Sequence, residues 1–320
     1  MKVKNVCILG GSGFVGRHLT ARLESAGYHT RVITRRRERN RDLLVLPHVE
    51  VVEADIHDPK ALTAQFEGMD AVINLVGVLH DSGRKGAGFR DAHVGLSRLV
   101  VQACREAGVN RLLHMSALNA NAAAGASQYL RSKGEAENIA HTTGKPSVAV
   151  TSFRPSIIFG EGDGFFSLLH GILALTPGFF PVACPGARFA PVYVGDVVEA
   201  MVKTLQDPNS HGRGYELCGP RAYTFQELVR YVADLMGARV WTPGLPDWMS
   251  RIQAHLLSLA PGKPMTYDNY LSMTVDSVCT QDGLGELGIT PNTVESIVPR
   301  YLFDSGSRTH FARYRQGARR

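Results

Sequence analysis

The sequence predicts an α/β fold in which a doubly wound parallel sheet is followed by a smaller, mostly helical part. Three observations carry this prediction. The chain opens on an apolar strand that runs into a glycine turn and then into an amphipathic helix. Strand and helix patterns alternate up to about residue 155. Beyond Arg154 the alternation stops, and proline and glycine become frequent. Such alternation favours a parallel sheet of the Rossmann type, covered by helices on both faces.

The first turn has the spacing G-x-x-G-x-x-G. Glycine allows the tight bend and the close approach of backbone N–H groups to a phosphate, and Gly16 lets the helix lie close to the strand. The helix N-terminus adds partial positive charge and free donors, which suit a pyrophosphate. A tight turn without a ligand is the alternative. The residues expected to bind a dinucleotide here are Gly10, Gly11, Ser12, Gly13, Phe14, Val15 and Gly16.

The remaining elements of the first part follow from apolar runs that alternate with amphipathic segments. Their order places the loops after the strands along one edge of the sheet, where ligands bind. The predicted strands are Lys4–Leu9, His29–Thr34, Val49–Glu53, Ala71–Leu75, Arg111–Met115 and Val148–Phe153. The predicted helices lie near Phe14–Ala26, Pro59–Phe66, Asp91–Ala107 and Ser127–His141.

The second part is expected to form a smaller domain that binds a substrate or a partner. We assign residues 1–155 to the nucleotide-binding domain, with 191–205 returning to it, and residues 156–190 and 206–305 to the second domain. Residues 306–320 form a basic tail, for which a solvated end is favoured over binding to nucleic acid or anionic lipid.

Two apolar segments of the second part bear on its ligand. Residues 164–184 hold no Asp, Glu, Lys or Arg, but proline and glycine interrupt them, so the helical portion is too short to span a bilayer. They predict a helix and loop beside an apolar pocket, with membrane-surface contact as the alternative. The helix predicted over Asp247–Leu259 carries Trp248 and Ile252 on one face, for which core packing is favoured over lipid contact.

Composition sets further bounds. The chain has 320 residues, 44% of them hydrophobic and 20% charged, which is typical of a globular protein with a sizeable core. The net charge is +6, and arginines cluster after the second predicted strand. Five cysteines without a C-x-x-C pair argue against a disulfide framework and a zinc site, so no metal is expected. With no signal-peptide pattern, we expect a cytoplasmic location.

Three side chains suggest acid–base chemistry. Tyr129 and Lys133 are four residues apart on a predicted helix and therefore share one face. A lysine beside a phenol favours the phenolate, which lowers the tyrosine pKa towards neutrality. Ser116 ends the preceding strand, where its hydroxyl could bind the same reacting oxygen.

With these motifs in place, the chain resembles the extended branch of the short-chain dehydrogenase/reductase superfamily over about residues 3–240. The resemblance implies that Tyr129 is the acid–base group, that Lys133 holds the ribose and that Ser116 orients the substrate carbonyl. Three further motifs extend it: A-D-I after the third strand, N-L-V-G at the end of the fourth and F-R-P-S-I at the end of the sixth. Further cofactor residues that it implies are Asp55 and Ile56 on the adenine side, Leu75, Val76 and Gly77 under the cofactor, and Pro155 and Ile157 near the nicotinamide.

A narrower resemblance is to the atypical group that contains the NDUFA9-type accessory subunit of respiratory complex I and its bacterial relatives. It rests on N-L-V-G, S-A-L-N-A-N and Y-L-R-S-K, and it implies NADPH binding. The family's usual asparagine in the helix after strand four is missing, with Ala92 or His93 at that position. A packed or solvated role is favoured for His93, so we expect an incomplete proton relay.

The end of the second strand predicts which cofactor binds. NAD-binding proteins usually place a carboxylate there, whereas this chain has Arg35 and Arg36. Both could bind a 2′-phosphate, and a solvated basic turn is the alternative. We therefore predict NADP(H) as the cofactor.

Two functions follow as hypotheses. The first is an NADP-dependent oxidoreductase or epimerase acting on a hydrophobic small molecule such as a quinone or an isoprenoid. The second is a catalytically silent NADPH-binding subunit or assembly factor of a respiratory or quinone-synthesis complex, in contact with the inner membrane at most peripherally.

Overall fold

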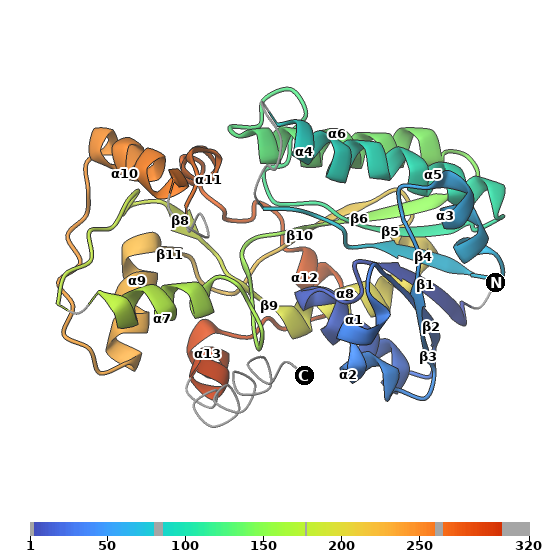
Figure 1. Ribbon diagram of the computed structural model, residues 1–320, viewed down its shortest axis with the longest axis horizontal. Coiled ribbons are helices and arrows are strands. Elements are labelled where there is room, and N and C mark those ends of the chain that lie inside the picture. The colour runs from blue at the N-terminus through green and yellow to red at the C-terminus, as the bar shows by residue number, and fades with distance from the viewer. Residues whose placement is uncertain (1–2, 80–85, 177, 260–264, 303–320) are drawn as a thin grey trace.

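The computed structural model describes residues 3–79, 86–176, 178–259 and 265–302. Figure 1 shows a sheet flanked by helices at one end of the molecule and a group of helices at the other. The expectation of a doubly wound parallel α/β sheet is confirmed. The basic tail predicted at 306–320 lies outside the described residues.

The central sheet has seven strands, all parallel, in the order β10-β6-β5-β4-β1-β2-β3. The order reverses between β1 and β4, so the loop after β1 opens at the switch point, where open α/β sheets bind ligands. The strands are β1 (Asn5–Leu9), β2 (His29–Thr34), β3 (Val49–Glu53), β4 (Ala71–Asn74), β5 (Arg111–Met115), β6 (Ala149–Pro155) and β10 (Gly214–Leu217).

Alternating side chains of the strands build a separate core on each face of the sheet. In β1, Val6 and Ile8 belong to the cluster shared with α1 (Phe14–Ser25) and α8 (Val194–Leu205). Cys7 and Leu9 belong to the opposite cluster. That second face is covered by α3 (Pro59–Phe66), α5 (Leu96–Glu106) and α6 (Gln128–Gly144).

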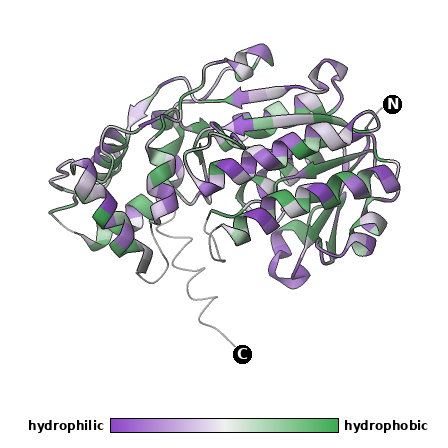
Figure 2. Ribbon diagram, turned by 90° about the horizontal axis from the view of Figure 1, so that it is seen from above, coloured by the Kyte–Doolittle hydropathy of each residue, from purple (hydrophilic) through white to green (hydrophobic). Residues whose placement is uncertain are grey.

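The flanking helices are amphipathic, as burial of one face requires. Hydrophobic and hydrophilic residues alternate along them in Figure 2. Short elements complete this part: η1 (Arg37–Arg39), α2 (Arg41–Leu44), α4 (Ala87–Phe89) and the π-helical segment η2 (Arg90–Gly95).

The second group of helices has its own apolar core, which includes Phe166, Leu228 and Val298. Two short two-stranded sheets, β7–β9 and β8–β11, lie along the connections to the main sheet. The elements are β7 (Ile158–Phe159), α7 (Phe166–Leu175), β8 (Arg188–Phe189), β9 (Val192–Tyr193), η3 (Pro208–Ser210), β11 (Tyr223–Thr224), α9 (Phe225–Leu235), α10 (Asp247–Leu259), α11 (Tyr267–Met273), α12 (Gly283–Glu286) and α13 (Val294–Leu302).

Three features differ from the sequence analysis. β10 is a strand that the analysis did not predict, because four residues beside a proline and several glycines give little alternation. Cys218 and Cys279 form a disulfide, although the odd cysteine count argued against one. On α10, Trp248 is 63% and Leu256 64% exposed, so core packing is the wrong interpretation of that face.

No helix within the described ranges is long and apolar enough to cross a membrane.

Candidate functional site

The glycine turn after β1 has the close contacts that glycine spacing predicts. Gly10 adopts a left-handed conformation with φ +79°, and the N–H of Gly13 donates to its carbonyl at 3.0 Å. A Cβ on Gly16 would lie 2.4 Å from the Gly10 carbonyl oxygen, so only glycine fits there. The turn therefore brings α1 directly onto the end of β1.

The N-terminus of α1 is open to an anion. Gly13 is its N-cap and supplies no side chain, and the first turn of the helix holds no acidic residue. The first N–H groups of the helix therefore lack a side-chain acceptor, and the helix dipole favours negative charge there. A diphosphate fits this arrangement.

The loop after β4 passes close to α6. The N–H of Leu75 donates to the Leu9 carbonyl, which continues the sheet pairing beside the glycine turn. A Cβ on Gly77 would lie 3.3 Å from Lys133 Nζ, so the loop backbone and the lysine approach each other closely. A cofactor that crosses this edge would meet the loop backbone and the lysine together.

Tyr129 and Lys133 lie on α6 as predicted, but their electrostatics differ from the expectation. Lys133 is buried and donates from Nζ to the Met115 carbonyl at 2.8 Å. Burial lowers the pKa of Lys133 to about 8. Burial also raises the pKa of Tyr129 to about 12. The expected lowering of the phenol pKa is therefore wrong for this structure, in which desolvation dominates.

Ser116 does not present a free donor. Its hydroxyl donates to Glu137 Oε2 at 2.5 Å, and Glu137 forms an ion pair with Arg154 at 2.7 Å. Glu137 lies one turn after Lys133 on α6 and is almost fully buried. The Glu137 carboxylate in turn raises the pKa of Arg154. Ser116 could accept a hydrogen bond from a ligand, whereas the predicted donation to a carbonyl conflicts with this geometry.

His93 is packed, as the favoured interpretation had it. Its ring is 3% exposed, its Nε2 accepts from the N–H of Val78 at 3.1 Å, and its Nδ1 bonds Ser132 Oγ at 2.8 Å. Burial, with a smaller effect of Lys133, lowers the pKa of His93 to about 3. The ring also contacts Tyr129 edge-on, at 5.7 Å between centroids. His93 thus joins the loop after β4 to α6 as a neutral side chain.

Arg35 and Arg36 follow β2 and are both exposed. Neither guanidinium has an ion-pair or hydrogen-bond partner in the described part of the chain. Arg37, by contrast, donates from Nε to the Val51 carbonyl at 3.1 Å. After β3, the Asp55 carboxylate accepts through Oδ1 from the N–H of His57 at 2.9 Å.

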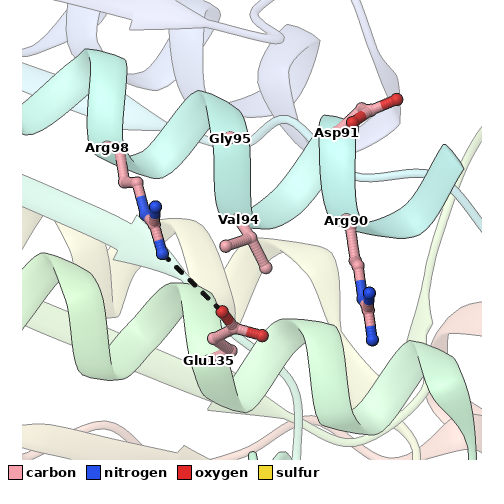
Figure 3. Close-up of a pocket in the computed structure, with 6 residues that line it drawn as sticks. All are labelled: Arg90, Asp91, Val94, Gly95, Arg98 and Glu135. Atoms are coloured by element: carbon pink, nitrogen blue, oxygen red, sulfur yellow. Dashed lines mark ion pairs between the residues drawn. The ribbon is translucent and has the colours of Figure 1, made fainter. Parts of the chain in front are cut away.

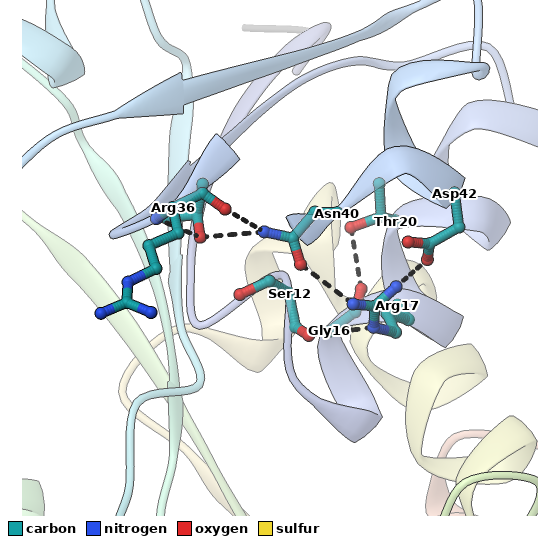
Figure 4. Close-up of polar contacts among 8 residues, drawn as sticks. Ser12, Gly16, Arg17, Thr20, Arg36, Asn40 and Asp42 are labelled. Carbon is teal, nitrogen blue, oxygen red and sulfur yellow. Dashed lines mark hydrogen bonds and ion pairs between the residues drawn. The ribbon is translucent and has the colours of Figure 1, made fainter. Parts of the chain in front are cut away.

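A polar network joins the glycine turn to the chain after β2 (Figure 4). Arg17 donates from Nε to the Ser12 carbonyl at 3.0 Å and from Nη2 to Asn40 Oδ1 at 2.9 Å. Its other amino group pairs with Asp42. Asn40 donates to the Arg36 carbonyl at 2.9 Å. Figure 4 draws no contact on the Arg36 guanidinium.

The remaining predicted residues lie at the same carboxyl edge of the sheet. Pro155 ends β6 and accepts from the N–H of Leu118, and Ile157 accepts from that of Val192. Val76 donates from its N–H to Asn74 Oδ1. Ile56 packs against the core under α3 and α5. The assignment of all these residues to a cofactor stays a prediction.

Sequence reasoning missed several residues around this edge. Asn40 and Arg17 carry no motif signal, because their roles depend on contacts across two loops. Glu137 could have been found, since it continues the four-residue spacing of Tyr129 and Lys133. Asp268, on α11, accepts from the N–H groups of Gln128 and Tyr129, at 2.8 and 3.2 Å, across 140 and 139 positions. Nothing local in the sequence signals that contact.

A groove of about 480 Å³ lies elsewhere, between η2, α5 and α6 (Figure 3). An ion pair of 3.9 Å between Arg98 and Glu135 crosses it. Its lining includes none of the predicted site residues, and we assign it no role. The lining residues are Arg90, Asp91, Val94, Gly95, Arg98 and Glu135.

The fold and the glycine turn define a protein of the dinucleotide-binding Rossmann class. Its sequence matches the NAD dependent epimerase/dehydratase family over residues 6–218. The chain belongs to this family, within the extended short-chain dehydrogenases/reductases, and the predicted resemblance is confirmed.

Two relatives show what kinds of protein this chain is similar to. The chain is 30% identical over 303 residues to the mitochondrial NADH dehydrogenase (ubiquinone) 1 alpha subcomplex subunit 9 of Mus musculus, covering 90% of this chain and 77% of that protein. It is 32% identical over 247 residues to a ceramide reductase of Caulobacter vibrioides, covering 76% and 74%.

Solved structures share the fold at lower identity. MoeE5, solved with UDP-glucuronic acid and NAD, superposes with a TM-score of 0.75 and 19% identity, covering 95% of this chain and 99% of that one. DesIV, a dTDP-glucose 4,6-dehydratase from Streptomyces venezuelae with NAD and TYD bound, gives 0.74 and 19%, covering 96% and 98%. These similarities establish the architecture alone.

Proposed function

We propose that this protein is an NADPH-dependent oxidoreductase that acts on a hydrophobic small molecule. One observation carries the proposal: α6 brings Lys133 to the loop at Gly77, at the same sheet edge as the open N-terminus of α1, and Tyr129 lies one turn earlier on α6. A bound dinucleotide would therefore extend from the glycine turn towards the tyrosine.

The chain's own residues would then divide the work. The glycine turn and the N-terminus of α1 would hold the diphosphate. Lys133, which now donates to the Met115 carbonyl, would bind a ribose hydroxyl, and Tyr129 would donate or accept the proton at the reacting oxygen. The nicotinamide supplies or accepts hydride when bound. An ammonium beside the ribose also favours the phenolate, opposing the desolvation that now keeps the pKa of Tyr129 high.

The preference for NADPH is supported by the Arg35 and Arg36 guanidinium groups after β2, which have no partner among the residues that the structure describes. A charge-assisted hydrogen bond contributes about 1.5–3 kcal/mol, which is roughly tenfold or more in affinity. Arg35 and Arg36 could each form one with a 2′-phosphate.

We expect replacement of both Arg35 and Arg36 by alanine to weaken NADPH binding at least about tenfold, measured by nucleotide fluorescence. In Arg37→Ala the affinity should stay within about twofold, because that guanidinium is already held by Val51.

A hydrophobic substrate is supported by the uncharged stretch around α7, of which Leu175 and Phe179 are exposed. One relative of this chain is named a ceramide reductase, which acts on an apolar compound by that name. Quinones and isoprenoids are the first compounds to test.

Turnover is the direct test of the enzyme proposal. Oxidation of NADPH is followed with quinone, isoprenoid and ceramide-type carbonyl compounds. Tyr129→Phe should lower the rate about a hundredfold or more while the NADPH affinity stays within about threefold. A rate that survives this change would remove Tyr129 from the proposed chemistry.

A second candidate is a silent NADPH-binding subunit or assembly factor of a respiratory quinone oxidoreductase. The exposed apolar face of α10 favours it, since an exposed tryptophan and aliphatic side chains on one helix suit a protein surface. Relatives named as subunits of NADH-ubiquinone oxidoreductase support it. In this case we propose a cytoplasmic protein that docks peripherally at the inner membrane. Bound NADPH that no substrate oxidises, with co-purification of respiratory-complex subunits, would favour it over the enzyme.

A further inference from the structure

We propose that Asn40 is a positioning residue for NADPH binding. It holds the backbone after β2 so that Arg35 and Arg36 can bind the 2′-phosphate of the nucleotide near the glycine turn. The inference rests on the proposed NADPH binding and adds the residue that organises it.

The Asn40 side chain is buried, at 6% exposure, and every polar group on it is used. Its Oδ1 accepts from Arg17 Nη2 at 2.9 Å. Its Nδ2 donates to Thr34 Oγ1 at 3.1 Å and to the Arg36 carbonyl at 2.9 Å. A buried amide with all of these bonds made has one orientation, because any rotation would leave a buried polar group unpaired.

These bonds connect the turn after β1 to the loop after β2, beyond the last paired residues of the two strands. One end of the path is the Ser12 carbonyl in the glycine turn, which Arg17 Nε holds at 3.0 Å. The other end is the backbone of Arg36 itself (Figure 4). Between β2 and Asn40 the chain forms the short η1, and Arg37 holds it to β3 through bonds to Glu53 and to the Val51 carbonyl. The Asn40 amide adds the bond that ties this segment to Arg17 on α1.

The charges of the arginines around Asn40 also suit the binding of a phosphate. Asp42 pairs with Arg17, so the positive charge of Arg17 is offset. Arg35 and Arg36 have no such partner in the parts of the chain described here. Arg35 and Arg36 thus carry positive charge without an ion-pair partner where Asn40 fixes the backbone, and a phosphate on the adenosine ribose is the ligand chemistry that fits it.

Nucleotide affinity tests this arrangement without a substrate. In Asn40→Ala we expect the dissociation constant for NADPH to rise about tenfold, and that for NADH to stay within about threefold. Asn40→Asp keeps the acceptor for Arg17 but loses both donors, and it should weaken NADPH binding at least as much. Thr34→Val removes one partner of the amide, with a smaller expected effect of about two- to threefold. Asn209→Ala, at an exposed asparagine far along the chain, serves as control.

Three outcomes would overturn the proposal. Unchanged NADPH affinity in Asn40→Ala contradicts it, and so does an equal loss for NADPH and NADH, which would mean that Asn40 only maintains the fold. If the unmodified protein binds both nucleotides equally well, the NADPH preference and this inference fail together. If the Arg35 and Arg36 substitutions weaken NADPH binding while Asn40→Ala does not, only this inference fails.

Discussion

Two buried histidines beneath α6 make the stability of this protein depend on pH. His93 and His114 are each 3% exposed, and burial lowers the pKa of each to about 3, with smaller contributions from Lys133. Neither ring nitrogen of His114 has a hydrogen-bond partner in the described part of the chain. Both rings are therefore neutral in the fold at pH 7.

The unfolded chain takes up these protons at its ordinary pKa near 6.5, whereas the folded chain does not. The stability that the neutral rings contribute is complete above about pH 6.5 and is lost as the pH falls towards 3. Each histidine should cost about 1.4 kcal/mol of unfolding free energy per pH unit in that window.

His114→Leu should remove one of these two contributions. It should also raise the unfolding free energy at pH 7 by about 1 kcal/mol, because two unpaired buried polar atoms disappear. Urea unfolding at pH 7 and pH 5.5 measures both effects. His48→Leu, at an exposed histidine, should leave the slope as it is. If the unfolding free energy of His114→Leu falls as steeply between pH 7 and pH 5.5 as that of the unmodified protein, His114 takes up its proton in the folded protein over this range.

At the scale of elements, the N-terminus of α6 is held from another part of the chain. Ser127 caps the helix from within, while the Asp268 carboxylate of α11 accepts from the N–H groups of Gln128 and Tyr129. Ser272, also on α11, donates to Ser127 at 2.8 Å. The position of Tyr129 therefore depends on α11, about 140 residues away in the sequence.

Asp268→Ala should free the first turn of α6. We expect faster hydrogen exchange at the amides of Gln128 and Tyr129 and a loss of about 1 kcal/mol in unfolding free energy, as for a removed cap. Asp282→Ala removes a similar cap from the short α12, where Asp282 accepts from Gly285. Exchange in α6 should not change in that control. If Asp268→Ala left these two amides protected, Ser127 alone would hold the turn.

This contact also shows where sequence reasoning ends. Strands β2, β3 and β5 match their predicted bounds, because apolar periodicity and glycine punctuation are local signals. The spacing of Tyr129 and Lys133 likewise placed both on one helix. Other features depend on burial and on partners far away in the sequence, which periodicity does not measure. They are the hydrogen bond that occupies the Ser116 hydroxyl, the raised pKa of Tyr129 and the hydrogen bonds of the Asn40 amide.

At the scale of the whole molecule, the Cys218–Cys279 disulfide closes a loop with a sequence separation of 61. It ties the end of β10 to the segment after α11, where Ser277 accepts from Ser156 at 2.8 Å. The cross-link thus holds the later helices against the edge of the main sheet.

Removal of this disulfide should destabilise the protein. A loop of this length is worth up to about 4 kcal/mol in the chain-entropy model, and measured values often fall below it. We expect Cys218→Ser combined with Cys279→Ser to lower the unfolding free energy by about 2–4 kcal/mol. Cys184→Ser serves as control, since its thiol is free. Equal stability of the oxidised and reduced protein would show that the bond adds nothing to the fold.

Strand β10 comes late in the chain although it belongs to the main sheet, and this limits where the protein can be truncated. The strand at the β6 edge of the sheet, and α8 beneath it, are supplied only after the chain has already passed through α7. A fragment that stops after β6 would leave the apolar surface of α1 bare and the β6 backbone unpaired, inviting aggregation. Anyone who wants the nucleotide-binding half by itself would have to splice residues 194–217 back onto it.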